Sequence, residues 1–121
     1  YVEGVKTAMN RIVTQVQCCA DDSDCCPNFY YFHFLSQVRM YYPGARKKME
    51  DTFQKEHEWW KKVIQKAKNN GEIKQDTDVQ KSASLFRQVF WGLSYEQSFL
   101  NGLNVEELKD KFDYLYSLLK A

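Results

Sequence analysis

Between residues 79 and 100, side chains recur at unbroken alternating steps of four and three residues, and all but one of them are apolar. The members of this series are Val79, Ala83, Phe86, Phe90, Leu93, Gln97 and Leu100. Such steps place residues on one face of an α-helix, so the series predicts a helix with a continuous apolar face. A second apolar ridge on the same helix consists of Leu85, Val89, Gly92 and Phe99. A helix with two apolar faces must be covered on both sides, one by its own domain and one by a partner.

Helical spacing also occurs in four further segments, and only five Gly and two Pro interrupt the 121 residues. The predicted helices cover residues 2–20, residues 28–42, residues 43–69, a segment that starts after Asp76 or Thr77 and stops at Asn101-Gly102, and a segment that runs from Asn104 to residue 119. Residues 28–42 are rich in aromatic side chains, which would also suit a strand, but polar Gln37 and Arg39 continue the segment at helical spacing. Because the linkers are short, neighbouring helices should pack antiparallel. The sequence therefore predicts an all-α fold, a five-helix bundle, in a single domain of residues 1–121.

Local signals mark several helix ends. Pro43 suits the first turn of the third helix, and Asn70-Gly71 is a typical stop at its end. Asn104 with Glu107 three residues later is close to a capping box at the start of the last helix.

Charge and hydropathy exclude several classes of protein. The formal net charge is only +1, whereas a nucleic-acid binder usually carries a clear excess of Lys and Arg. The aromatic stretch from Phe29 to Leu35 is too short to span a membrane and contains a His. We expect a cytoplasmic protein without a signal peptide or membrane contact. The chain begins with Tyr1 rather than Met, which predicts a fragment or a processed product.

No residue pattern predicts an enzyme or a cofactor. The sequence His57-Glu58-Trp59-Trp60-Lys61 begins like the helical zinc motif H-E-x-x-H, but Lys61 stands where the second ligand should be. No Gly-rich phosphate loop occurs, and nothing places Ser, Cys and His as a triad. We therefore expect no catalytic residues, no metal ligands and no cofactor.

The four cysteines form two adjacent pairs, Cys18-Cys19 and Cys25-Cys26, around the acidic residues 21–24. Acidic neighbours should raise thiol pKa values and lower reactivity, and adjacent cysteines seldom ligate one zinc ion well. Inert thiols in a reducing compartment are the favoured interpretation, and a metal or redox sensor is the alternative.

Residues 67–79 read Ala-Lys-Asn-Asn-Gly-Glu-Ile-Lys-Gln-Asp-Thr-Asp-Val, and Ala83, Phe86 and Gly92-Leu93 follow them. A long helix ending in Ala-x-x-x-Gly-Glu-Ile, then Asp-x-Asp, then a helix with an early Ala and a later Gly-Leu resembles the C-terminal regulatory domain of the TetR family of transcription regulators. The resemblance covers residues 43–119 well, whereas the first two helices fit only by position and length.

The resemblance implies a helical effector-binding domain that acts in transcription regulation as a homodimer, with the last two long helices pairing with their copies as a four-helix bundle. The family's N-terminal helix-turn-helix domain, which binds operator DNA, would lie before Tyr1. We therefore expect DNA binding only through that missing domain and none by these 121 residues. The family's ligand contacts vary too much to transfer by motif.

The positions of residues on the predicted helices indicate which of them bind the effector and which form the dimer interface. Aromatic and apolar side chains of the second, third and fourth helices should converge on a pocket for a small hydrophobic or aromatic effector of low charge. The predicted ligand-binding residues are Tyr30, Tyr31, Phe34, Val38, Phe53, Trp60, Phe86 and Phe90. The predicted dimer interface consists of Leu85, Val89, Gly92, Phe99, Leu108, Leu115 and Leu119. A helical interaction or scaffold domain without a ligand is the alternative from another functional class.

Overall fold

The computed structural model describes residues 1–17 and 27–121. Its helices within these ranges are α1 (Val2–Gln17), α2 (Pro27–Tyr41), α3 (Ala45–Asn69), α4 (Val79–Ser98) and α5 (Val105–Leu119). These ranges hold no strand, only an isolated bridge between Ile73 and Lys120. The predicted all-α class and the five predicted helices are confirmed, including the aromatic α2 that could have been a strand.

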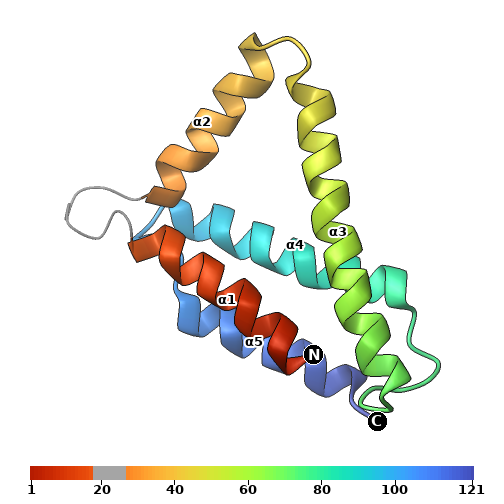
Figure 1. Ribbon diagram of the computed structural model, residues 1–121. Helices are drawn as coiled ribbons and strands as arrows, with labels where there is room; N and C mark the ends of the chain where they lie inside the picture. Colours follow the sequence, from red (N-terminus) through yellow and green to blue (C-terminus); the bar gives the residue numbers. More distant parts are fainter. Residues whose placement is uncertain (18–26) are drawn as a thin grey trace.

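Figure 1 shows α2, α3 and α4 as three sides of a triangle, with α1 and α5 lying beneath α4. The end of α5 returns to the loop between α3 and α4, where the Lys74 N–H donates to the Leu119 carbonyl (2.9 Å) and the Ala121 N–H donates to the Glu72 carbonyl (3.2 Å). These bonds fix the C-terminal end of α5 beside the end of α3.

The core lies where α3, α4 and α5 meet, and three aromatic rings form its centre. Trp60 of α3 stacks on Phe86 of α4 with ring centroids 5.1 Å apart, and Phe112 of α5 lies 5.4 Å from Trp60 and 5.7 Å from Phe86. The other buried apolar members of this core are Val5, Ile64, Ala67, Ile73, Ala83, Leu93, Leu103 and Leu108. Burying each large side chain of this kind stabilises the fold by about 1.5–3 kcal/mol.

Tyr1 attaches the start of the chain to this core. Its ring stacks on Tyr116 at 4.0 Å and meets Phe86 edge-on at 5.8 Å, and its hydroxyl donates to the Phe112 carbonyl (3.1 Å). Burial, helped by the negative charge of Asp113, raises the pKa of the Tyr1 hydroxyl. Tyr1 therefore remains a neutral hydrogen-bond donor that joins the N-terminal end to α5.

Two of the predicted helix ends are confirmed. α3 ends before Asn70, and Gly71 adopts the left-handed conformation (φ 74°) while the Glu72 N–H donates to the Ala67 carbonyl (3.0 Å). This is the Schellman arrangement that glycine favours. α5 is capped by Asn104, whose side chain accepts from the Glu107 N–H (3.1 Å).

Three predicted helix boundaries are wrong. α3 starts at Ala45 rather than at Pro43, because Gly44 (φ 78°) makes the turn from α2 in a left-handed conformation that no helix can include. α4 is capped by Asp78, whose side chain accepts from the Lys81 N–H (3.0 Å), and not by Asp76 or Thr77.

α4 also ends at Ser98, before the predicted stop at Asn101-Gly102, because turns occupy residues 99–101. The Gly102 N–H closes this turn region by donating to the Gln97 carbonyl (3.0 Å). Residues 18–20, predicted as the end of the first helix, lie outside the described residues.

Candidate functional site

Six side chains of α2, α3 and α4 are joined by ring contacts, a hydrogen bond and a cation–π contact. We call them the junction cluster: Tyr31 and Phe32 of α2, Phe53 and Glu56 of α3, and Arg87 and Trp91 of α4. The cluster combines aromatic rings with one acidic and one basic group, whereas the core formed with α5 is apolar.

Trp91 is the centre of the cluster. Its ring meets Phe32 at 5.7 Å and Phe53 at 5.2 Å, both in edge-to-face geometry. Phe32 also contacts Tyr95 one turn further along α4, at 5.3 Å. Because edge-to-face pairs add about 0.5–1.5 kcal/mol each beyond area burial, these contacts fix the indole between α2 and α3.

Glu56 brings a carboxylate into this aromatic environment. The Trp91 indole N–H donates to its Oε2 atom at 2.9 Å. Burial raises the pKa of the Tyr31 hydroxyl, and the negative charge of Glu56 raises it further. None of the ion pairs formed by the described residues involves Glu56, which is half-buried.

Arg87 supplies the opposite charge. Its guanidinium carbon lies 5.5 Å from the centre of the Phe53 ring, a cation–π arrangement. Its Nε atom is buried and has no hydrogen-bond partner, and no described carboxylate forms an ion pair with this side chain. A buried N–H without a partner is costly, and among the described residues this is the one buried side-chain nitrogen or oxygen that has none.

The cluster borders solvent. Tyr31 is 52% exposed and Phe53 is 36% exposed, whereas Phe32, Glu56, Arg87 and Trp91 are half-buried. Two of its rings are therefore accessible at the surface, beside the half-buried Glu56 and Arg87. The arrangement offers aromatic rings, the Glu56 carboxylate as an acceptor, and the Arg87 guanidinium and Tyr31 hydroxyl as donors.

The eight predicted ligand-binding residues fall into three groups: at or beside the junction cluster, in the core, and elsewhere on α2. Tyr31 and Phe53 belong to the junction cluster, and the Phe90 ring lies 6.1 Å from that of Trp91. Trp60 and Phe86 instead stack on each other in the core, where they are 6% and 1% exposed. The remaining α2 positions are Tyr30 and Phe34, which are more than half exposed, and the half-buried Val38.

Sequence reasoning missed Phe32, Glu56, Arg87 and Trp91 as members of the cluster. One signal was present: Glu56 interrupts the apolar stripe of α3 between Phe53 and Trp60. When a polar residue interrupts an apolar stripe and is nevertheless half-buried, it indicates a specific polar contact.

The predicted dimer residues also differ in exposure. Leu85 and Phe99 are 53% and 57% exposed and Gly92 is exposed, although the Phe99 ring contacts Phe29 and Tyr95. Val89, Leu115 and Leu119 are partly buried against the core. Leu108 is wholly buried within the single chain, so its side chain is not accessible to a partner. A Cβ added at the exposed Gly92 would meet nothing within 4 Å in the single chain.

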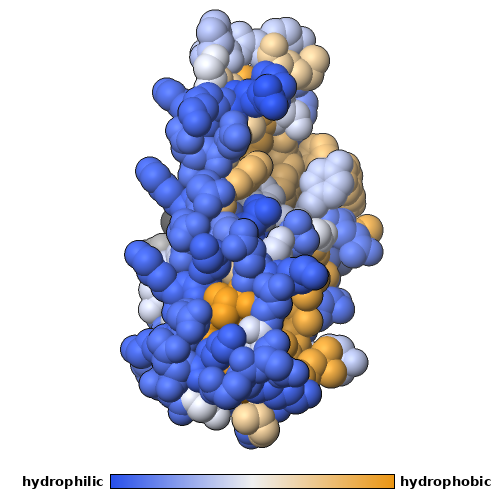
Figure 2. All heavy atoms as spheres, turned by 90° about the vertical axis from the view of Figure 1, so that its right-hand side faces the viewer, coloured by the Kyte–Doolittle hydropathy of each residue, from blue (hydrophilic) through white to orange (hydrophobic). Residues whose placement is uncertain are grey.

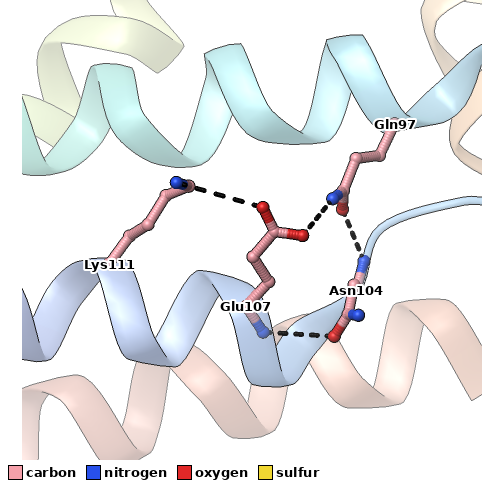
Figure 3. Close-up of polar contacts among 4 residues, drawn as sticks. All are labelled: Gln97, Asn104, Glu107 and Lys111. Carbon is pink, nitrogen blue, oxygen red and sulfur yellow. Dashed lines mark hydrogen bonds and ion pairs between the residues drawn. The ribbon is translucent and has the colours of Figure 1, made fainter.

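A polar network holds the end of α4 against the start of α5 (Figure 3). Gln97 Nε2 donates to Glu107 Oε2 (2.6 Å), and Gln97 Oε1 accepts from the Asn104 N–H (2.7 Å). The other oxygen of Glu107 pairs with Lys111 at 3.9 Å. In a capping box the Glu107 carboxylate would accept from the Asn104 N–H, but here Gln97 takes that place and joins the two helices.

The outer face of α3 is solvated. Figure 2, viewed from the side of α3, shows a mostly hydrophilic face, with a small hydrophobic patch in its lower middle and more hydrophobic atoms along the edge that lies at the back of Figure 1. Exposed lysines such as Lys48, Lys55 and Lys62 lie on this helix.

The described residues contain no group of three or more His, Cys, Asp or Glu that could hold a metal ion. All four cysteines lie outside the described residues. Within the described helices, none has the length and apolar character needed to cross a membrane. Comparison with family models, with curated proteins and with solved structures finds no match to this chain.

Proposed function

We propose that the chain is the effector-binding and dimerisation domain of a TetR-like transcription regulator. The junction cluster is the binding site for a small, mostly apolar molecule, and the second ridge of α4 meets its copy in a homodimer. The sequence pattern of residues 67–93 supports the family. The proposal for the site stands on the geometry of the cluster.

The unusual composition of the junction cluster is the observation that carries the proposal. Rings that serve only as core are buried, as Trp60 and Phe86 are, whereas Tyr31 and Phe53 keep large exposed areas next to two charged groups. Ligand sites typically combine apolar walls with a few placed polar groups. Three helices contribute, so a bound molecule would change how α2, α3 and α4 pack.

Regulation would follow by a shift in population. A ligand that contacts α2, α3 and α4 together favours one packing of these helices, and α4 also carries the proposed dimer ridge. The two subunits would then adopt one relative arrangement, which sets the spacing of DNA-binding domains attached before Tyr1. A ligand with equal affinity for both arrangements would have no such effect.

Tryptophan fluorescence tests ligand binding, with 4-butylbenzamide as a neutral apolar probe. Titration should change the emission of the chain, because the probe contacts Trp91. The change should persist in Trp59→Phe, whose indole packs beside Trp60 at 5.0 Å, and should disappear in Trp91→Phe. A change that survives in Trp91→Phe places binding elsewhere. No change at millimolar probe would favour a scaffold domain without a ligand.

A further inference from the structure

Arg87 carries a charge that the described residues do not neutralise. Its guanidinium lies over Phe53, and its Nε atom is buried without a hydrogen-bond partner. The acidic member of the junction cluster does not supply this partner, because Glu56 accepts from Trp91 instead and forms no ion pair with Arg87. The half-buried guanidinium therefore lies beside the partly exposed Phe53 ring, and no carboxylate of the described residues forms an ion pair with it.

We infer that the junction cluster selects amphipathic monoanions, namely molecules with one carboxylate on an aromatic or alkyl body. This inference rests on the proposed function and names the chemical class of its ligand. The carboxylate accepts hydrogen bonds from the Arg87 guanidinium, whose planar fork matches a carboxylate in two-point geometry. The apolar body packs against Phe53 and Trp91.

The charge balance of the cluster explains why one negative charge is preferred. Glu56 is half-buried near the same rings, so a second anionic group on the ligand would face its carboxylate without a cation to offset it. A cationic ligand would face Arg87, which already occupies the face of Phe53. A molecule with a single carboxylate supplies the hydrogen-bond partner that Arg87 lacks, and it leaves the hydrogen bond between Trp91 and Glu56 intact.

Three probes of the same shape separate these possibilities: 4-butylbenzoate, 4-butylbenzamide and 4-butylbenzylamine. Calorimetric titration of the chain should give 4-butylbenzoate an affinity about tenfold or more above that of the other two, the range expected for a charge-assisted hydrogen bond. Arg87→Gln should remove this preference, so that the benzoate and the amide bind the variant with similar affinities. Arg46→Gln, which removes an exposed charge at the start of α3, should change neither affinity.

Arg87→Lys keeps the charge without the planar fork, so it should bind the benzoate several-fold more weakly than the parent chain and should show a smaller preference for the benzoate over the amide. This comparison remains decisive if Arg87→Gln fails to fold. Equal affinities for benzoate and amide in the parent chain, or an undiminished preference in Arg87→Lys and Arg87→Gln, would overturn the inference while the proposed ligand site stands. If none of the three probes binds, both the inference and the proposed site are wrong.

Discussion

Replacing Leu108 with glutamate is expected to unfold the chain. Leu108 has no exposed surface and lies in the core with Phe86 and Phe112. The substitution removes a large buried side chain and places a carboxylate among apolar groups, at a combined cost of about 5 kcal/mol or more. Small domains have a total unfolding free energy of about 5–15 kcal/mol, so the variant should lose its helical circular dichroism at or near room temperature.

The matched control is Leu118→Glu on the same helix, at a position that is 53% exposed. This variant should keep the helical circular dichroism of the parent chain. A well-folded Leu108→Glu variant that is merely monomeric would mean that Leu108 faces a partner, as the sequence predicted, and that the core described above is wrong.

Replacing Leu85 with glutamate is expected to dissociate the proposed homodimer without unfolding the chain. Leu85 is 53% exposed on the second ridge of α4, so a charge there is solvated in the monomer and becomes unpaired only at a dimer contact. The dimer dissociation constant should rise about a hundredfold or more. Sedimentation velocity should show a dimer for the parent chain at micromolar concentration and a monomer for the variant.

Gly92→Ala and Leu100→Glu sharpen this test. A Cβ added at Gly92 meets nothing within 4 Å in the single chain, and alanine in a helix is favoured over glycine by about 1 kcal/mol, so the monomer should be at least as stable. If two copies of α4 approach closely at this position, Gly92→Ala should nevertheless weaken the dimer. Leu100→Glu, at a position 70% exposed beyond the end of α4, should leave the dimer intact. A parent chain that remains monomeric throughout would contradict the proposed dimer.

The helices could be predicted because their determinants are local. The four-three spacing along α4, the stop at Asn70-Gly71 and the cap at Asn104 each depend on residues within a few positions of one another. The start of α3 could not be predicted in the same way. Both Pro43 and Ala45 are acceptable first residues, and the turn from α2 at Gly44 decides between them.

The candidate site was predicted only in part because it depends on how helices cross. Phe53 and Trp60 lie on one stripe of α3, yet Phe53 meets Trp91 of α4 near α2, whereas Trp60 meets Phe112 of α5 in the core. Spacing along one helix cannot show that its two halves face different neighbours. The charged groups Glu56 and Arg87 were missed because the spacing of apolar residues does not show which polar residues lie beside them.

The most direct test of the proposed site is the indole N–H resonance of Trp91, which donates to Glu56 in the free chain. In two-dimensional ¹H–¹⁵N spectra, 4-butylbenzamide should shift this resonance in a saturable way, with much smaller shifts for the indoles of Trp59 and Trp60, and Trp91→Phe should identify the signal. If the Trp91 resonance remains unchanged at the highest probe concentration, whether or not other resonances shift, the junction cluster does not bind the probe.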